Sequence, residues 1–273
     1  MEYKINYEEL DIIVSLYYKE QLNLKEIAEL YNVGHSTIER FLKRNNYVLK
    51  TSGTHKNGLS FNKEYFKEID SSNKAYYLGL LYADGALFKD NYAVSLTLKD
   101  DDSYIIEEFK QELNYTGRVK HLNTKSEQHS NISYIQLYSK EFYYNCLAKG
   151  LKDRKSNCLL FPDNNILSDQ YLYDFIRGYF DGDGCVHFIP DRGCLRVNIV
   201  GTFEFLTSLQ NIFVDTLGFS KVKIVQKSIN NNFSLQINRN EDIHCFYKKL
   251  YMNEKCLNLH RKKNIFDKWI ITK

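Results

Sequence analysis

Two short segments of the chain each carry a pair of small residues and then end in Asp-Gly. The segments are residues 77–85 and residues 176–184. In each segment the small residues are four positions apart, which places them on one face of a helix. Because a face without bulky side chains lets a second backbone approach closely, we expect the two helices to pack together. The small residues at this expected helix interface are Gly79, Ala83, Gly178 and Gly182.

This packing would bring the last acidic residues of the two helices, Asp84 and Asp183, next to each other. Two like charges brought together at helix ends repel each other unless a cation lies between them. Carboxylate oxygens are ligands that Mg²⁺ prefers. The repeat therefore predicts a paired-carboxylate metal site.

The composition sets only broad limits on function. The chain has 273 residues, 43% of them hydrophobic, which suits one large domain or two to three small ones. Its net charge is only +3, but residues 151–273 carry 18 basic and 13 acidic side chains. A basic excess of this size is compatible with a polyanionic partner if it gathers on one face.

The cysteines and the N-terminus indicate a compartment. The six cysteines include no Cys-x-x-Cys pair, and their irregular spacing favours buried, reduced thiols over a disulfide framework or a zinc site. The first residues lack the apolar run of a signal peptide, and no stretch approaches the roughly 20 apolar residues of a membrane span. We therefore expect an intracellular protein without a membrane partner, in the cytoplasm, the nucleoid or an organelle.

The first fifty residues have helical periodicity. Apolar spacing predicts a helix over 7–19. Asn23, with Glu26 as a capping-box partner, predicts a second helix over 24–30, and a third follows over 36–44. Helix, turn and basic helix resemble the helix-turn-helix of DNA-binding proteins, whose last helix lies in the major groove; a three-helix packing unit without that role is the alternative. The predicted DNA contacts of the third helix are Ser36, Thr37, Arg40, Lys43 and Arg44.

After each Asp-Gly motif the sequence predicts the same order of elements. In the first half we expect strands over 86–89 and 92–99, a helix over 101–113, strands over 117–122 and 132–138, and a helix over 140–149. In the second half we expect strands over 185–189 and 194–200, a helix over 203–217, strands over 221–227 and 233–239, and a helix over 241–250. With the motif helices, each half is an α-β-β-α-β-β-α unit. The predicted fold class is therefore α+β, with a pseudo-two-fold tandem repeat behind an all-α N-terminal domain.

One face of each expected sheet is apolar and packs on helices, which leaves the other face open. Gln, Asn, Arg and Lys are the side chains that contact base edges and phosphates. The DNA contacts predicted on the open face of the first half are Arg118, Lys120, Tyr134, Gln136 and Tyr138. Those predicted in the second half are Arg196, Asn198, Lys221, Lys223, Ser234, Gln236 and Asn238.

The two motifs, with the elements between them, resemble the LAGLIDADG homing endonuclease family in its single-chain form. The resemblance implies that the motif helices form the centre of a pseudo-dimer and that a saddle of two sheets grips DNA. It implies a divalent ion at the scissile phosphates, Mg²⁺ or Mn²⁺, and assigns its binding to Asp84 and Asp183. It also implies a basic catalytic residue late in each half, a role that falls on Lys155 and Lys262, with Lys263 as a rival to Lys262.

The sequence departs from the family pattern at two positions. The earlier acid of the motif is Tyr82 in the first copy and Asp181 in the second. The resemblance makes this position structural, so the expected site does not depend on it. Arg177 replaces a small or apolar residue of the second motif, and we expect it to point away from the helix interface and toward a phosphate.

The sequence therefore predicts a site-specific, metal-dependent endonuclease that hydrolyses double-stranded DNA as a monomer with internal pseudo-two-fold symmetry. The expected organisation is a helix-turn-helix domain over 1–50, a linker over 51–69, and two halves over 70–165 and 166–273. A non-catalytic DNA-binding transcriptional regulator and an intron RNA maturase stay open as alternatives on the same fold. Retention of both motif aspartates argues against the regulator, whereas no residue separates the nuclease from the maturase.

Overall fold

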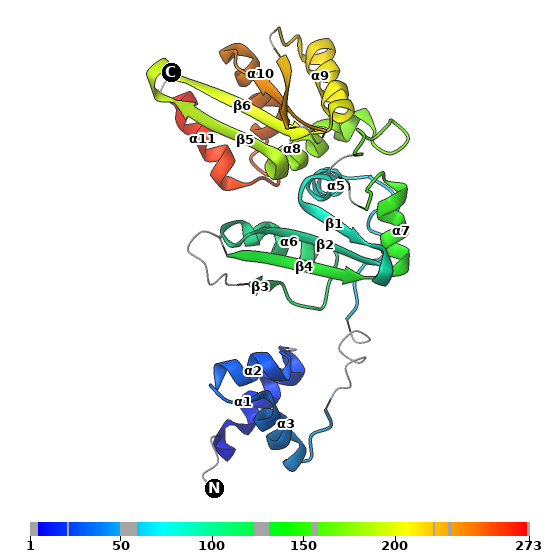
Figure 1. The fold of residues 1–273 in the computed structure, drawn as a ribbon, viewed down its shortest axis with the longest axis vertical. Coiled ribbons are helices and arrows are strands. Elements are labelled where there is room, and N and C mark those ends of the chain that lie inside the picture. The colour runs from blue at the N-terminus through cyan, green and yellow to red at the C-terminus, as the bar shows by residue number, and fades with distance from the viewer. Residues whose placement is uncertain are drawn as a thin grey trace. The chain divides into compact units, whose positions relative to one another are not determined.

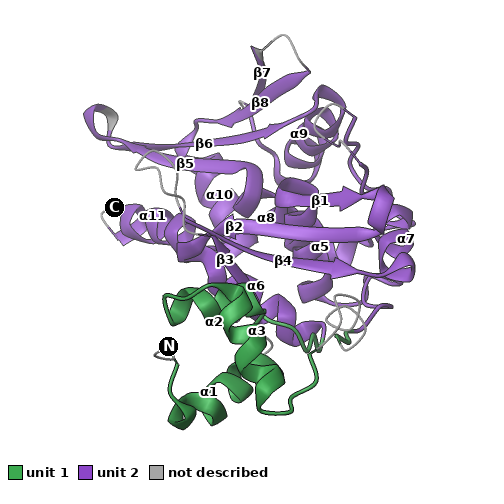
Figure 2. Ribbon diagram, turned by 60° about the horizontal axis from the view of Figure 1, so that its bottom comes forward, with its two compact units in different colours: residues 1–61, 114–118 green, residues 62–113, 119–273 purple. Residues whose placement is uncertain are grey.

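The structure is a computed structural model. It describes residues 5–20, 22–49, 59–122, 131–153, 155, 158–220, 222–228 and 231–271. The chain divides into two compact units (Figure 2): unit 1 comprises residues 1–61 and 114–118, and unit 2 comprises residues 62–113 and 119–273.

Unit 1 contains short helices from the N-terminal part of the chain. α1 (Leu10–Val14) lies between a 3₁₀ turn and a π-helical turn, and α2 (Leu24–Leu30) and α3 (His35–Arg44) follow it. The predicted capping box is confirmed: the Asn23 side chain accepts from the backbone of Glu26, whose carboxylate accepts from the backbone of Asn23. The apolar core of the unit comprises Ile5, Ile13, Tyr17, Ile27, Ala28, Ile38 and Leu42.

Unit 2 contains two runs of elements in the same order (Figure 1). The first run comprises α5 (Ser72–Asp84), β1 (Gly85–Phe88), β2 (Ala93–Lys99), α6 (Ser103–Glu112), β3 (Lys120–Leu122), β4 (Ile132–Tyr138) and α7 (Lys140–Ala148). The second run comprises α8 (Leu172–Asp183), β5 (Gly184–Ile189), β6 (Cys194–Gly201), α9 (Phe203–Leu217), β7 (Val222–Ser228), β8 (Asn232–Ile237) and α10 (Asn240–Tyr251). A further helix, α11 (His260–Ile271), ends the second run.

Each run forms a four-stranded antiparallel sheet, with the strand orders β1-β2-β4-β3 and β5-β6-β8-β7. Because alternate side chains of a strand point to opposite faces, each sheet has two different faces. In the second sheet, for example, Ile199 pairs with Leu235 and both are buried, whereas the neighbouring pair Asn198 and Gln236 lies on the opposite face. α6 and α7 contact the first sheet, and α9 and α10 contact the second.

The two runs meet through α5 and α8, which Figure 1 shows between the two sheets. Residues 75–82 of α5 and 175–181 of α8 are all buried. A helix that is buried on every side belongs to the centre of a fold. The motif helices therefore end inside unit 2, which is a mixed helix-and-sheet fold with two four-stranded antiparallel sheets.

Two features differ from the sequence prediction. The predicted order of elements ends at the helix over 241–250, whereas α11 lies beyond it. The buried residues of α11 are Lys262, Phe266 and Trp269, and a lysine at the first of these positions interrupts the apolar stripe by which a helix is predicted. The six cysteines are all free, as expected, but only Cys146 is buried and the expectation of buried thiols is wrong for the exposed Cys158 and Cys185.

No helix of the described ranges combines the length and the apolar character that crossing a membrane requires.

Candidate active site

The glycines of the two motifs lie where the backbones of α5 and α8 touch. A Cβ atom added to Gly79 would lie 2.1 Å from the carbonyl oxygen of Phe175, and one added to Gly178 would lie 1.9 Å from that of Tyr76. A Cβ on Gly182 would lie 2.2 Å from the Cβ of Ala83. The structure thus brings together all four small residues of the predicted interface. Larger side chains would not fit there, because the two helix backbones lie too close.

Asp84 and Asp183 are the last residues of α5 and α8. The two helix ends are adjacent: a Cβ on Gly182, the residue before Asp183, would lie 2.9 Å from Oδ2 of Asp84. Burial, and then the charge of Asp183, raise the pKa of Asp84 to about 6. Burial also raises the pKa of Asp183, although Lys155, Lys262 and a hydrogen bond from Tyr179 oppose this rise. The negative charge of Asp183 therefore acts on Asp84, and the predicted role of both carboxylates as metal ligands stays a prediction.

Lys155 and Lys262 bind the ends of these two helices in a matched way. The Lys155 ammonium donates to the carbonyl oxygens of Leu81 at 2.7 Å and of Ala83 at 2.6 Å. The Lys262 ammonium donates to the equivalent carbonyls, those of Phe180 at 2.7 Å and Gly182 at 3.2 Å, and additionally to those of Asp181 and Gly184.

Each lysine therefore neutralises partial negative charge at a helix C-terminus. Burial lowers both lysine pKa values to about 8, while the nearby aspartates counteract that shift. Both side chains consequently carry a positive charge at neutral pH.

The donor set at the helix ends suits a hard divalent cation. Within the described part of the chain, no group of three or more His, Cys, Asp and Glu side chains is arranged to hold a metal. The carboxylates at the two helix ends are those of Asp84 and Asp183. Mg²⁺ at phosphate-binding sites commonly takes one or two carboxylates and completes its shell with water and phosphate oxygens. Two observations favour a cation here: the ends of α5 and α8 are adjacent, and burial, followed by the charge of Asp183, raises the pKa of Asp84.

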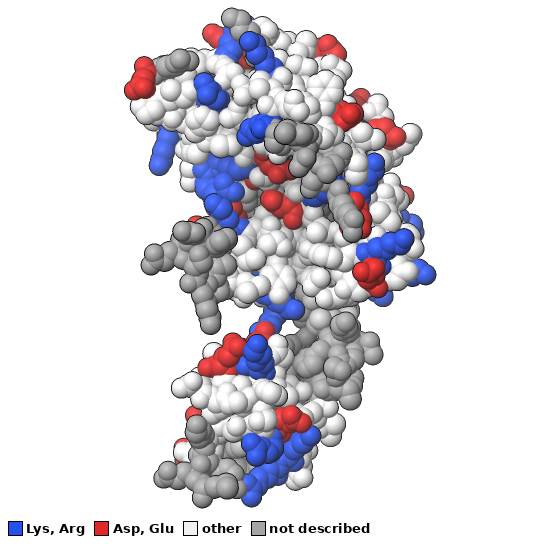
Figure 3. Space-filling view, viewed as in Figure 1, with Lys and Arg blue, Asp and Glu red and all other residues white. Residues whose placement is uncertain are grey.

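Positive charge accompanies this acidic centre. On the face drawn in Figure 3, lysine and arginine side chains gather beside acidic side chains where the two runs of unit 2 meet. A surface of this kind suits a polyanion whose phosphates approach the carboxylates.

The predicted contacts of the first sheet lie mainly on one face. Lys120 pairs in register with Tyr134, and its ammonium lies 5.7 Å from the centre of that ring. Gln136 lies on the same face, where its Oε1 accepts from the Tyr138 hydroxyl at 2.9 Å. Arg118 is the exception: it precedes β3 and belongs to the segment of residues 114–118 that groups with unit 1. The prediction that Arg118 lies on the strand face is therefore wrong.

In the second sheet, Asn198, Gln236 and Lys223 form one cross-strand row. Arg196 lies on the same face, and its Nε donates to Oδ1 of Asn238 just past the end of β8 at 3.1 Å. These five predicted residues therefore lie together.

Two further predicted residues of this sheet have a different outcome. Ser234 is fully buried, with 0% of its surface exposed. The prediction of a direct DNA contact fails for Ser234, because the strand that carries it is covered at that point. Lys221 lies outside the described residues.

On α3 the predicted contacts form the polar side of the helix, opposite the buried Ile38 and Leu42. The Nε of Arg40 donates to the carbonyl oxygen of Ser36 at 3.1 Å, and Lys43 pairs with Glu39 at 2.8 Å. The exposed members of the set are Ser36, Arg40, Lys43 and Arg44, while Thr37 is half-buried.

Arg177 does not have the expected role. Its side chain is buried, and its guanidinium donates to the carbonyl oxygens of Leu257 at 2.7 Å and Leu250 at 3.1 Å while pairing with Asp174 at 2.6 Å. The predicted phosphate contact is wrong, because the side of α8 that carries Arg177 packs against residues 250–257, whose carbonyl groups need donors away from water.

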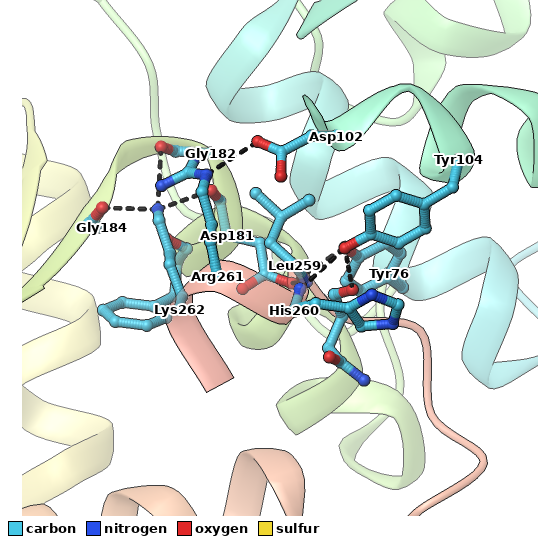
Figure 4. Close-up of polar contacts among 12 residues, drawn as sticks. Tyr76, Asp102, Tyr104, Asp181, Gly182, Gly184, Leu259, His260, Arg261 and Lys262 are labelled. Carbon is cyan, nitrogen blue, oxygen red and sulfur yellow. Dashed lines mark hydrogen bonds and ion pairs between the residues drawn. The ribbon is translucent and has the colours of Figure 1, made fainter. Parts of the chain in front are cut away.

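Sequence reasoning missed a set of contacts at the start of α11 (Figure 4). The Nε of Arg261 donates to the buried carboxylate of Asp102 at 2.8 Å, and the backbone N–H of His260 donates to the Tyr104 hydroxyl at 2.7 Å. Asp102 and Tyr104 belong to the first run, so these bonds tie the two runs together. Arg261 also counteracts the rise in the pKa of Asp84. The one signal in the sequence is the likeness of residues 261–264, Arg-Lys-Lys-Asn, to residues 154–157, Arg-Lys-Ser-Asn. It does not give the partners of Arg261, because they are far away in sequence.

Comparison with known proteins gives a fold class and one relative. No family model matches the chain. The fold is similar to those of homing endonucleases. The meganuclease I-SmaMI bound to uncleaveable DNA is 12% identical, with 74% of this chain and 90% of that chain covered and a TM-score of 0.48. Mesophilic variants of I-DmoI are 15% identical, with 76% and 99% covered and a TM-score of 0.47, and the LAGLIDADG homing endonuclease I-LtrWI bound to its target DNA is 13% identical, with 77% and 90% covered and a TM-score of 0.47.

One sequence relative is much closer. The chain is 30% identical over 190 residues to the uncharacterized protein MJ0314 of Methanocaldococcus jannaschii, an alignment that covers 66% of this chain and 67% of that protein. The chain belongs to the same protein family as MJ0314.

Proposed function

We propose that the chain is a site-specific endonuclease of the LAGLIDADG homing endonuclease type, which hydrolyses both strands of double-stranded DNA with Mg²⁺ or Mn²⁺. The observation that carries this proposal is the pair of partly buried carboxylates at the ends of two helices in backbone contact, with a lysine bound to each helix end. Bringing two carboxylates together away from water costs free energy. Such a pair with perturbed pKa values is typical of a site that performs chemistry.

Each charged residue has a role in this chemistry. Asp84 and Asp183 would hold the divalent ion, which when bound polarises the phosphate and neutralises the charge of the leaving oxygen. Lys155 and Lys262 are fixed by carbonyl groups beside the carboxylates, so their positive charge is already in place when negative charge develops on the phosphate. The matched carbonyl contacts give the site a pseudo-two-fold arrangement, which suits two antiparallel DNA strands.

The remaining predicted residues would bind the DNA outside the cleavage point. Side chains on the polar faces of the two sheets would contact base edges and phosphates. These are Lys120, Tyr134, Gln136 and Tyr138 in the first sheet, and Arg196, Asn198, Lys223, Gln236 and Asn238 in the second. In the same proposal, residues 1–50 form a helix-turn-helix domain that adds affinity through α3 and a linker over 51–69, the halves span 70–165 and 166–273, and the protein acts as a monomer.

The carboxylates also weigh against a regulator that only binds DNA. Such a protein needs no pair of repelling aspartates at its centre, and replacing them would make the helix ends easier to bury. An RNA maturase on this fold would instead bind structured intron RNA, which makes RNA binding an outcome of the test below.

Selection of cleaved duplexes from a random-sequence DNA library, with and without Mg²⁺, tests the proposal. We expect cleavage only with the ion, and its loss in Asp84→Asn and in Asp183→Asn. Asp101→Asn, at an exposed position of the first run, is the matched control and should cleave like the unaltered protein. Full activity of either motif variant would overturn the assignment, and binding of structured RNA without DNA cleavage would favour the maturase.

A further inference from the structure

Asp181 is a fully buried carboxylate in the middle of the second motif, with 0% of its surface exposed. It accepts hydrogen bonds from the hydroxyl of Tyr76 at 2.9 Å and from the backbone N–H of Leu259 at 2.8 Å, two residues that Figure 4 labels beside it. It also accepts from the hydroxyl of Tyr251 at 2.7 Å. These donors come from α5, from α10 and from the residue that precedes α11. A buried carboxylate with this many partners from separate elements fixes their relative positions.

The bond to Leu259 determines where α11 begins. Leu259 precedes the first residue of the helix, and its carbonyl oxygen accepts from the backbone N–H groups of Lys262 at 2.9 Å and Lys263 at 3.1 Å. A carboxylate at a helix N-terminus is stabilised by the helix dipole. Asp181 therefore anchors the first turn of α11, the turn that carries Lys262.

The same residue also binds the other end of this segment. The Lys262 ammonium donates to the backbone carbonyl oxygen of Asp181 at 2.5 Å. The Asp181 side chain thus holds the backbone of residue 259, while its main chain accepts from the side chain of residue 262. Residues 259–262 form a closed loop on Asp181, which leaves the Lys262 side chain little freedom to move away from the end of α8.

Among the described residues of the first half, no carboxylate at the equivalent position holds the lysine segment. The equivalent position is Tyr82, which is 1% exposed and donates to the carbonyl oxygen of Lys149 at 2.6 Å. Lys155 is therefore held by its own bonds to carbonyl oxygens. From the described part of the segment that carries Lys155, the side chain at position 82 accepts no hydrogen bond, in contrast to Asp181 in the second half. The two halves present matched lysines that are supported in different ways.

We propose that Asp181 is a positioning residue that fixes Lys262 at the end of α8, so that its loss slows cleavage of one DNA strand far more than of the other. This inference rests on the proposed endonuclease function. It goes beyond that function in making the two half-sites unequal and in naming the residue responsible.

The test compares two sets of substitutions. Tyr76→Phe with Tyr251→Phe removes two donors but keeps the bond from Asp181 to Leu259. Adding Asp181→Leu gives a triple variant in which only the Leu259 N–H has lost its partner, since replacing both members of a buried polar pair by apolar groups is far less disruptive than replacing one. Asp181→Asn, which keeps the shape and removes the charge, serves if the triple variant does not fold. Tyr82→Phe is the matched control in the first half.

Two readouts decide the outcome. The first is single-turnover nicking of a duplex recovered from the library, with a different fluorophore on each strand; Lys262→Met identifies the strand that depends on Lys262. We expect the triple variant to cut that strand at least tenfold more slowly relative to the other strand, with the double variant and Tyr82→Phe leaving the ratio unchanged. If Asp181→Asn replaces the triple variant, we expect the same strand to be cut at least threefold more slowly relative to the other strand. Equal slowing of both strands would overturn the proposal, because a loss of overall stability has that effect.

The second readout is hydrogen exchange of the backbone amides of residues 259–263, measured on the protein without DNA. We expect exchange at least tenfold faster in the triple variant than in the double variant, and unchanged exchange there would also overturn the proposal. If the unaltered protein cleaves no duplex from the library, the endonuclease function fails and with it the strand effect. The exchange measurement still decides whether Asp181 holds the segment.

Discussion

Gly178→Ala gives the sharpest test of the contact between the two motif helices. The added Cβ would lie 1.9 Å from the carbonyl oxygen of Tyr76, 2.8 Å from its carbonyl carbon and 3.0 Å from the backbone nitrogen of Leu80. All three are backbone atoms, so no side chain can rotate to make room. Carbon and oxygen atoms approach to about 3.3 Å at their closest in such contacts, so α5 and α8 must separate by roughly 1.4 Å.

The expected cost follows from this separation. Forcing an extra methyl group into a packed interior costs about 1–3 kcal/mol, and a clash with rigid backbone belongs at the upper end. We expect Gly178→Ala to lower the free energy of unfolding by about 3 kcal/mol, or the melting temperature by on the order of 10 °C. Thermal unfolding followed by circular dichroism measures the change. The shift should also separate Asp84 from Asp183 and lower cleavage.

Gly193→Ala is the control for this substitution. Its φ of +57° strains any residue with a Cβ, but nothing lies within 4 Å of the added atom. The strain alone costs about 1–2 kcal/mol. If Gly178→Ala destabilises the protein no more than Gly193→Ala does, the backbones of α5 and α8 are not in direct contact and the account of the interface is wrong.

Four further outcomes follow from the site. The pKa of Asp84 rises from 3.8 to about 6 on folding, so the stability that the Asp84 carboxyl contributes is present below pH 4 and is lost as the pH rises past 6. Without metal, urea unfolding should therefore show Asp84→Asn to be about 3 kcal/mol more stable than the unaltered protein at pH 8, and no more stable at pH 3. Lys155→Met should slow the cutting of one strand by about a hundredfold in single-turnover assays while DNA affinity changes little, and a loss of affinity alone would contradict its catalytic role. Arg40→Ala should weaken DNA binding and lower the slope of log affinity against log salt by about 1, and an unchanged slope would exclude a phosphate contact. Gln136→Ala should relax base preference at one position by about 1–3 kcal/mol in competition binding, and uniform weakening across sequences would argue against base recognition.

Local patterns predicted most of the elements because each depends on neighbouring residues. The capping box at Asn23 fixes the start of α2 through two short-range hydrogen bonds. The alternation of Val94, Leu96 and Leu98 with polar residues marks β2, because the side-chain period of a strand is two. The helix over 203–217 was predicted with its observed bounds.

The predictions that failed depended on burial, which local patterns do not determine. The expectation that Arg177 points toward a phosphate is wrong. The expected role of Lys262 stays a prediction, and only its burial was not predicted, since lysine and arginine are seldom buried without partners. In the structure each has carbonyl partners, supplied for Arg177 by residues 250 and 257 and for Lys262 by the end of α8. Ser234 alternates with the buried apolar residues of its strand, which predicts an exposed side chain, and it is nevertheless buried. The carbonyl partners of these side chains, and the residues that bury them, come from segments far away in sequence.

The sequence by itself determined the helix interface and the two aspartates at its end. The helical period places residues four positions apart on one face, and Asp-Gly after that face fixes where the carboxylates lie. Only the tertiary structure decided how these carboxylates are supported. The bond between Asp181 and Leu259, the carbonyl groups around Lys155 and Lys262 and the pairing of Arg261 with Asp102 each join residues about 70 or more positions apart. The burial that gives those bonds their strength exists only once both halves have packed.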